Sequence, residues 1–300
     1  MKIGVSDPDR YTFSQQLIDH WESQGHEVVK SLYHEPGFVA ECDVVFYDYA
    51  SAMVKQLSEE GAKPKKCIVR AIDVENYMNY YKTFNWDLID HFIVLNEAQK
   101  RMFKERPDFT CPEEKIHVIS PGVNLDKFTL KQGLQTTNKA VFVGRFWIGK
   151  NVAGAIELVE ILNSFGNEWT LHLRGQGLDP RWWDKYIKHK IECARFPIII
   201  DDRQEDMNAY LEDKSLMIVS SFKEAFSYAG AEALAKGIPT VFNNWYGAED
   251  VWPKEWIYSN PWDGALKAVE VGKLLPSELR HYIEERYDEK YMFERIDSLL

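Results

Sequence analysis

The chain has 300 residues, of which 45% are hydrophobic and 28% are charged, so it can fill one large or two modest cores and is not intrinsically disordered. Its 47 acidic side chains outnumber the 36 basic ones and give a net charge of -11. That charge argues against a general binder of nucleic acids or anionic membranes, although a local basic patch is left open.

Other features of the sequence concern location and redox state. No apolar run reaches the roughly 18 residues that a transmembrane helix needs, and the first residues do not form a signal peptide. The four cysteines are far apart with no CxxC pair, which favours reduced thiols over a zinc site. We therefore expect a cytoplasmic protein with no transmembrane segment.

Short apolar segments alternate with amphipathic ones from the first residues onward, and this alternation is typical of parallel α/β structure. In the first half we predict strands at 2–6, 27–32, 43–47, 66–71, 92–95 and 116–119. Helices are predicted at 12–23, 52–60, 74–81 and 97–105. The turn at Asp7-Pro8-Asp9 is expected to lead into a helix cap near Thr12.

A polar, irregular stretch at 129–138 is the best linker, and a second α/β series follows it. Its predicted strands are 140–143, 170–174, 198–201, 216–220 and 240–242. Its predicted helices are 152–163, 181–194, 205–212, 228–236, 265–273 and a helical tail from 277. Because a second α/β series begins after the linker, the sequence predicts two doubly wound, Rossmann-like domains with a cleft between them. One large sheet is the alternative.

The loop after strand 140–143 carries Gly144, Arg145 and Lys150 just before a helix. Ligands of open α/β sheets bind at the carboxyl ends of strands, where glycine allows close backbone approach and the two cations can neutralise a diphosphate. Taken alone, the pattern fits solvated surface residues equally well.

A second segment, 220–241, holds the carboxylates Glu224 and Glu232 on either side of a helix start that is rich in small residues. Such a helix start leaves its N–H groups open to a phosphate, which the helix dipole also favours. A carboxylate beyond the phosphate can accept hydrogen bonds from a ribose diol. The structural alternative makes Glu232 a buried capping group and Glu224 a solvated surface residue.

Four stretches in this order resemble glycosyltransferase family 4, the retaining nucleotide-sugar enzymes of the GT-B fold. They are His117–Phe128, Val143–Phe146 with Lys150–Asn151, Leu171–Gly177, and the two-glutamate segment that closes with Gly237–Val241. The resemblance implies an acceptor-binding domain over 1–135 and a donor-binding domain over 138–285. It also implies a final helix over 286–300 that crosses back to the first domain.

The resemblance also implies roles for individual residues. Arg145 and Lys150 would hold the donor diphosphate, Glu232 would bind the ribose hydroxyls, and Glu224 would lie near the donor sugar. The remaining donor-binding positions would be Gly144, Gly175 and Gly177, the backbone N–H groups of Ser227, Tyr228 and Ala229, and Arg203 near the base.

The sequence departs from the family pattern mainly in the first half. Ser6–Tyr11 replaces a glycine-rich loop, and Glu224–Ser227 replaces a glutamate-glycine-phenylalanine-glycine run. Asp73 follows a predicted strand that ends in Arg70, so it is a candidate to orient the acceptor hydroxyl, and capping the next helix is an equal alternative. The basic helix at 100–106 could touch an anionic acceptor or form a solvated face.

Together these patterns predict a retaining glycosyltransferase that moves a sugar from a nucleotide-diphosphate sugar, such as UDP-glucose, without a metal or cofactor. Its acceptor could be a glycan, a lipid-linked or small molecule, or, against the acidic charge, a DNA base. Two alternatives stay open: a non-catalytic nucleotide-sugar-binding protein, and a GT-B enzyme that acts on a sugar phosphate.

Overall fold

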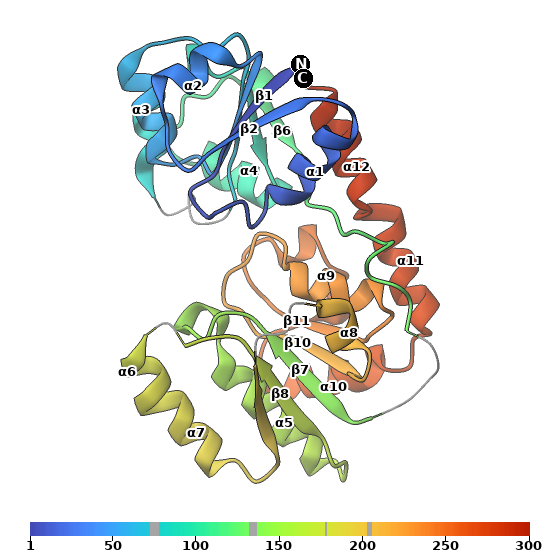
Figure 1. The fold of residues 1–300 in the computed structure, drawn as a ribbon. Coiled ribbons are helices and arrows are strands. Elements are labelled where there is room, and N and C mark those ends of the chain that lie inside the picture. Colours follow the sequence, from blue (N-terminus) through green and yellow to red (C-terminus); the bar gives the residue numbers. More distant parts are fainter. Residues whose placement is uncertain (73–77, 132–136, 178, 203–205) are drawn as a thin grey trace. The chain divides into compact units, whose positions relative to one another are not determined.

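The computed structural model describes residues 1–72, 78–131, 137–177, 179–202 and 206–300. The chain forms two compact units, Met1–Pro121 with Lys290–Leu300, and Gly122–Glu289 (Figure 1). Each unit contains one six-stranded sheet, and all strand pairs are parallel. The predicted α/β class is therefore confirmed. Along the chain, the first unit is left at Pro121 and the second begins at Gly122, before the predicted linker at 129–138. Residues 132–136 of that linker lie outside the described residues.

The sheet of the first unit has the strand order β2-β1-β3-β4-β5-β6. Its strands are β1 (Lys2–Ser6), β2 (Glu27–Ser31), β3 (Val44–Asp48), β4 (Cys67–Arg70), β5 (His91–Val94) and β6 (Ile116–Val118). Its helices are α1 (Gln15–Ser23), α2 (Pro36–Glu41), α3 (Ala52–Glu60) and α4 (Glu97–Lys104), with 3-10 turns at Asn79–Thr83, Trp86–Leu88 and Glu113–Lys115. Every residue of β3 is buried, as expected for an apolar strand that has helices on both faces.

The final helix, α12 (Glu289–Asp297), packs beside α1 on one face of this first sheet. Met292 and Ile296 enter the same apolar cluster as Ile3 of β1. The Asp297 carboxylate accepts a hydrogen bond from the indole N–H of Trp21 at 2.9 Å and lies 2.7 Å from the imidazole of His20. The last residues of the chain therefore complete the core that its first residues begin.

The sheet of the second unit has the order β12-β11-β10-β7-β8-β9. Its strands are β7 (Lys139–Val143), β8 (Thr170–Arg174), β9 (Ile198–Asp201), β10 (Leu216–Val219), β11 (Thr240–Asn243) and β12 (Ile257–Tyr258). Its helices are α5 (Val152–Ser164), α6 (Pro180–Trp182), α7 (Lys188–Cys193), α8 (Met207–Leu211), α9 (Tyr228–Ala235), α10 (Pro261–Val271) and α11 (Pro276–Arg286). A π-helical turn at Trp183–Ile187 and 3-10 turns at Ile148–Lys150, Ala248–Asp250 and Lys254–Trp256 complete it.

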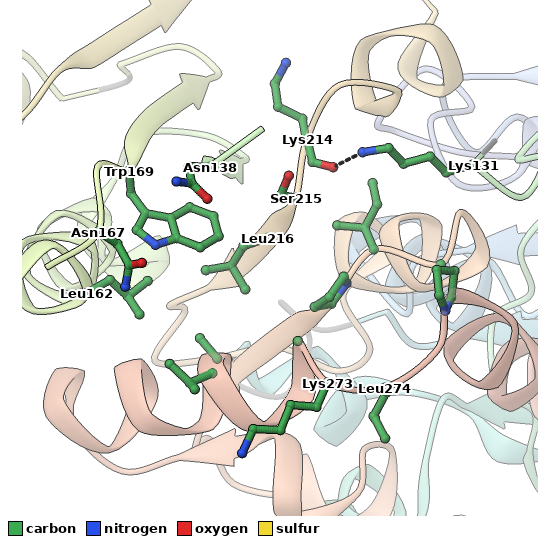
Figure 2. Close-up of a pocket in the computed structure, with 17 residues that line it drawn as sticks. Lys131, Asn138, Leu162, Asn167, Trp169, Lys214, Ser215, Leu216, Lys273 and Leu274 are labelled. Carbon is green, nitrogen blue, oxygen red and sulfur yellow. Dashed lines mark hydrogen bonds between the residues drawn. The ribbon is translucent and has the colours of Figure 1, made fainter. Parts of the chain in front are cut away.

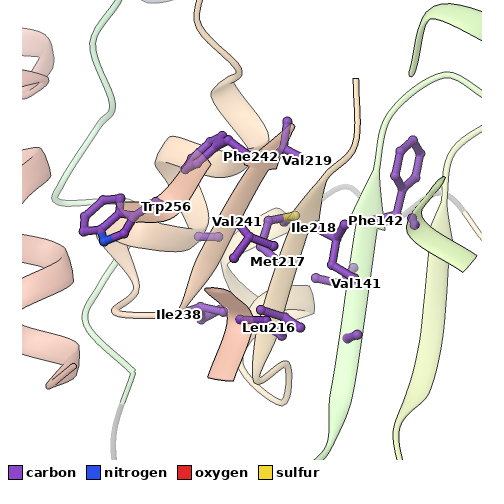
Figure 3. Close-up of a cluster of buried hydrophobic side chains, with 14 of the residues drawn as sticks. Val141, Phe142, Leu216, Met217, Ile218, Val219, Ile238, Val241, Phe242 and Trp256 are labelled. Carbon is purple, nitrogen blue, oxygen red and sulfur yellow. The ribbon is translucent and has the colours of Figure 1, made fainter. Parts of the chain in front are cut away.

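Apolar side chains of β7, β10 and β11 form the centre of this unit's core (Figure 3). Val141, Met217 and Val241 are fully buried. Phe242 stacks on Trp252 with ring centres 4.2 Å apart. Because the core holds the middle strands rigidly, the loops at their ends start from fixed positions.

The strand order determines where a ligand can bind in the second unit. From β7 the chain continues outward through β8 and β9, then returns to the other side of β7 and continues through β10, β11 and β12. The connections therefore leave in opposite directions from the carboxyl ends of β7 and β10, and ligands of doubly wound sheets bind in the crevice at such a switch point. Among the described residues, no helix is long and apolar enough to cross a membrane.

Candidate functional site

The loops after β7 and β8 touch each other through their backbones. Gly144 donates its N–H to the carbonyl of Arg174 at 3.0 Å, and Phe146 donates to Gln176 at 2.8 Å. A Cβ atom on Gly175 would lie 1.8 Å from the carbonyl oxygen of Gly144, so a side chain does not fit there. The three glycines that the sequence analysis selected, Gly144, Gly175 and Gly177, thus lie on two adjoining loops at one edge of the sheet.

The loops after β7 and β10 meet at the switch point through an ion pair. The ammonium of Lys150 contacts the Glu224 carboxylate, and Ser221 donates its hydroxyl to the same carboxylate oxygen at 2.8 Å. The Lys150 side chain is 27% exposed and that of Glu224 is 13% exposed, so both are reachable from solvent. Two predicted site residues that are 74 positions apart in the chain are therefore direct neighbours.

Hydrogen bonds to three backbone carbonyls of the loop after β7 fix this junction. Ser220 donates its hydroxyl to the carbonyls of Lys150 and Asn151, at 3.1 and 2.8 Å. Phe222 donates its N–H to the carbonyl of Gly149 at 2.9 Å. Arg145, on the same loop, has an exposed side chain. The cations that we associated with a diphosphate thus lie on a loop that is hydrogen-bonded to the end of β10.

The start of α9 lies at the same edge, directly after the loop that carries Glu224. Ser227 caps the helix and has a φ of 80°, a left-handed conformation that is uncommon for a residue other than glycine. Its hydroxyl accepts a hydrogen bond from the N–H of Gly230 at 3.4 Å. Tyr228 and Ala229, half-buried, form the first turn, where backbone N–H groups and the helix dipole favour an anion.

Glu232 lies in the second turn of α9 and has an unusual environment. Burial raises the pKa of its carboxyl to about 7, although the cations of Lys127 and Arg174 act in the opposite direction. The residue as a whole is only half-buried, so a ligand or solvent can reach it from the surface. Such a carboxyl changes its charge near neutral pH and can accept or donate a hydrogen bond there.

Arg174 belongs to this site but had no role in the sequence analysis. It ends β8, and its guanidinium lies 5.5 Å from the ring centre of Tyr210. The Tyr210 hydroxyl donates to Asp201 at 2.6 Å, and the same carboxylate lies 2.9 Å from the imidazole of His172. A strand-end arginine directly before Gly175 was the available signal. Arg203, predicted near a base, lies outside the described residues.

The first unit has its own switch point, between β1 and β3, where the loop after β1 is strained. Arg10 and Tyr11 adopt φ values of 55° and 64°, and both are left-handed. Asp7 is buried, and this burial raises the pKa of its carboxyl. It accepts hydrogen bonds from the hydroxyl of Ser14 at 2.6 Å and from the N–H of Asp9 at 2.7 Å. Strain of this kind gathers at functional sites.

A buried ion pair lies beside that loop. Arg70 donates to both carboxylate oxygens of Asp48, at 2.8 and 2.7 Å, and to the carbonyl of Phe13 at 3.1 Å. Asp73, the candidate for orienting an acceptor, lies outside the described residues. Lys100 and Lys104 of the basic helix both pair with Glu113. Among the described residues, no cluster of three or more His, Cys, Asp or Glu residues could hold a metal ion.

A cavity of the second unit with a volume of about 360 Å³ lies at the opposite edge of the sheet (Figure 2). It is bordered by the starts of strands, including Trp169 before β8 and Leu216 at the start of β10. The lysines around it, Lys131 among them, hydrogen-bond within the protein, as Lys131 does to the carbonyl of Lys214 at 2.9 Å. Because ligands of doubly wound sheets bind at the carboxyl ends, this cavity is not the candidate site.

Comparison with known proteins relates this part of the chain to a family of enzymes. Residues 126–257 match the family model of the glycosyl transferases group 1. This range includes the loops after β7, β8 and β10 and helix α9. The second unit is thus similar to the group 1 glycosyl transferases over these residues. The predicted glycosyltransferase resemblance is therefore confirmed at the level of this group, and family 4 in particular stays a prediction.

One similar relative is the GtfA subunit of the UDP-N-acetylglucosamine–peptide N-acetylglucosaminyltransferase of Streptococcus gordonii, which is 24% identical over 219 residues. The match covers 68% of this chain but only 42% of the relative, so the chain spans less than half of that relative's length.

Solved structures extend the comparison to both units. A glycosyltransferase from Rickettsia africae has a TM-score of 0.73 at 14% identity, with 99% of this chain and 97% of the other covered. Anabaena HepE in complex with UDP has a TM-score of 0.71 at 13% identity, with 99% of each chain covered. The sucrose-phosphate synthase of Thermosynechococcus elongatus reaches 0.75 at 13% identity, with 100% and 98% covered. These similarities confirm the predicted GT-B fold.

Proposed function

We propose that this protein transfers a sugar from a nucleotide-diphosphate sugar, bound at the β7–β10 switch point of the second unit, to an acceptor hydroxyl. One observation carries the proposal: Lys150, Glu224 and the amino-terminal end of α9 meet at that crevice. Cations and helix N–H groups are what a diphosphate needs, and a carboxylate is what sugar hydroxyls need. UDP is the proposed nucleotide because HepE is known in complex with UDP and GtfA is named as a UDP-N-acetylglucosamine transferase.

In this proposal each residue group binds one part of the donor. Arg145, Lys150 and the N–H groups of Ser227, Tyr228 and Ala229 bind the diphosphate, while Gly144, Gly175 and Gly177 allow the nucleotide to approach the backbone. Glu232 accepts hydrogen bonds from the ribose hydroxyls, and Arg174, whose positive charge acts on that carboxyl, keeps part of it ionised. Arg203 and Asp73 keep their proposed roles near the base and the acceptor.

The Lys150–Glu224 pair suggests how the site is kept ready before the donor arrives. Glu224 and Ser221 hold the lysine side chain at the mouth of the crevice, which lowers the entropy cost of fixing it later. When a diphosphate enters, Lys150 exchanges one anionic partner for another, and Glu224 becomes available to the hydroxyls of the donor sugar. Removal of either side chain is thus expected to disturb the other.

The proposed reaction breaks the bond between the anomeric carbon and a diphosphate oxygen and forms a bond from that carbon to the acceptor oxygen. The acceptor proton leaves on the departing nucleoside diphosphate, so atoms and charge balance. Negative charge grows on the leaving diphosphate, and Arg145, Lys150 and the α9 dipole stabilise it without a divalent ion. Retention of the anomeric configuration is part of the proposal and follows the family 4 resemblance.

The first test is donor binding, followed by product analysis. Isothermal calorimetry with UDP, GDP and ADP, and thermal shift with their sugars, should give binding to one nucleotide that Glu232→Ala weakens by roughly 10- to 100-fold, through loss of a charge-assisted acceptor. Glu160→Ala, on the exposed face of α5, is the matched control and should bind normally. Sugar release in the presence of EDTA and proton NMR of the first product would check metal independence and retention. Absence of binding to all three nucleotides would contradict the proposal.

A further inference from the structure

A pocket lined by aromatic side chains lies beside the proposed donor site in the second unit. Its volume is about 310 Å³, and its walls come from the loop after β7 and from the segment at the start of α6. We call it the aromatic pocket and define it by Trp147, Ile148, Asp179, Arg181 and Trp182. The same two loops carry residues of the proposed donor site, so a ligand in this pocket would lie next to the donor.

The rings of this pocket are held in place by the protein itself. The indole of Trp147 lies over Gly149, where an added Cβ would approach it to 2.4 Å. Trp182 stacks on Tyr186 with ring centres 4.6 Å apart. Phe146 stacks on Trp183 at 4.7 Å and thereby joins the two loops. A preformed surface of this kind binds a ligand at a low ordering cost.

The polar groups of the pocket are opposite in charge and exposed. The guanidinium of Arg181 lies 3.2 Å from the carboxylate of Asp179, and their side chains are 91% and 42% exposed. The pair adds no net charge, yet it offers hydrogen-bond donors and acceptors side by side. A fitting ligand is therefore neutral and combines an apolar face with several hydroxyl groups.

A sugar ring has these properties. One face of a pyranose is formed by C–H groups that can lie on an indole, while its hydroxyls project from the edge toward groups such as Arg181 and Asp179. Two other ligand classes fit less well. A nucleoside diphosphate is anionic, and the proposed site for it is at Arg145 and Lys150. An aliphatic chain would make no hydrogen bonds to Arg181 and Asp179. The volume of about 310 Å³ is at the small end of ligand sites, which suits one ring.

We propose that the aromatic pocket binds a sugar ring of the acceptor, which makes the acceptor of this enzyme a saccharide or glycoside. The identification of that sugar as the acceptor rests on the proposed function, whereas sugar binding in the pocket does not. Trp147 and Arg181 are then specificity residues that hold the acceptor beside the donor diphosphate.

The test measures saccharide and nucleotide binding separately. Saturation-transfer NMR with the methyl glycosides of glucose, galactose, mannose and N-acetylglucosamine reports the first, and calorimetry with UDP reports the second. Trp147→Ala and Arg181→Ala change the pocket, and both residues are exposed enough for the variants to fold. Trp262→Ala is the matched control, because Trp262 is 55% exposed and lies outside the pocket.

We expect at least one methyl glycoside to bind the wild-type protein. Its affinity should fall by roughly tenfold in Trp147→Ala, which corresponds to about 1.4 kcal/mol and is within the range of an aromatic contact. Arg181→Ala should weaken glycoside binding as well, while Trp262→Ala leaves it unchanged. UDP binding should stay the same in all three variants.

No glycoside binding in the wild type, or equal binding in every variant, would overturn the proposal. A parallel loss of UDP binding would overturn it too, because the pocket would then belong to the nucleotide. Glycoside binding in a protein that binds no nucleotide would refute the proposed function alone.

Discussion

Glu232 shows how a single residue can favour function at a cost in stability. Its carboxyl is buried in α9, and burial raises its pKa to about 7. The folded state therefore binds the proton more tightly than the unfolded state, whose carboxyl has the ordinary pKa of 4.5. The stabilising contribution is present below the unfolded pKa and is lost as the pH rises through 7, so at pH 8 the charged carboxylate destabilises the fold.

We predict that Glu232→Gln stabilises the second unit at pH 8 while it weakens nucleotide binding. The neutral amide removes the cost of the buried charge, which is on the order of 1–3 kcal/mol at pH 8 and close to zero at pH 4, below the pKa of the unfolded state. Differential scanning calorimetry at the two pH values measures the first effect and UDP titration the second. Glu160→Gln, on the exposed face of α5, is the matched control and should change neither. A variant less stable than wild type at pH 8 would show that the carboxylate is satisfied in the fold.

The pair of Lys150 and Glu224 gives a second prediction at this scale. Lys150→Ala should lower kcat by roughly 10²- to 10³-fold, with a smaller effect on UDP affinity, because the leaving diphosphate is most negative in the transition state. Glu224→Gln should lower kcat too, partly by releasing Lys150. Since the residues touch, the double variant should lose less activity than the two single losses combined. Additive losses in steady-state kinetics would show that the two side chains act independently.

At the scale of elements, the contact between the loops after β7 and β8 depends on the absence of a side chain. We predict that Gly175→Ala destabilises the second unit by about 1–3 kcal/mol, the range for overpacked sites, because the new Cβ would lie 1.8 Å from the Gly144 carbonyl oxygen. Gly37→Ala in α2 is the matched control, since no atom lies within 4 Å of its added Cβ. Urea unfolding followed by circular dichroism compares the two variants. Equal stability would mean that the two loops can separate freely.

Much of the element order could be predicted from the sequence because local patterns determine it. The apolar run at 43–47 predicts a strand, and β3 forms there with every residue buried. The helix expected at 12–23 begins only at Gln15, because Arg10 and Tyr11 adopt left-handed conformations that residue preferences do not favour. The π-helical turn at Trp183–Ile187 interrupts a helix that periodicity predicts as continuous.

The candidate site was less predictable, since its properties depend on residues that are distant in the chain. Gly144, Lys150, Glu224 and Ser227 could be selected from loop position and resemblance. The contact of Lys150 with Glu224 joins positions that are 74 residues apart, and no spacing rule indicates it. The environment of Glu232 depends in the same way on Arg174 and Lys127, which come from other segments.

At the scale of the whole molecule, the chain builds separate cores in its two units. The larger cluster runs from Val123 to Tyr287 and lies wholly within the second unit. Two smaller clusters lie in the first unit, and one of them is completed by Met292, Ile296 and Leu299. Every described residue of the proposed donor site belongs to the second unit. We therefore expect that a substitution in the core of the first unit can change the stability of that unit without changing donor binding.

We predict that Ile296→Ala lowers transferase activity but not UDP affinity. Ile296 is fully buried between α12 and the first sheet, and truncation of such a side chain costs about 2–5 kcal/mol. The loss acts on the first unit, where the proposed function assigns Asp73 a role in orienting the acceptor hydroxyl, and it spares the crevice at the β7–β10 switch point and the aromatic pocket. Calorimetry should resolve a lowered transition for the first unit and a second transition that UDP still raises. Ile199→Ala is the matched control, because Ile199 is 44% exposed on β9 and its truncation should leave both transitions in place. If Ile296→Ala weakens UDP binding as strongly as it lowers activity, the two units are coupled and the separation of their cores does not extend to function.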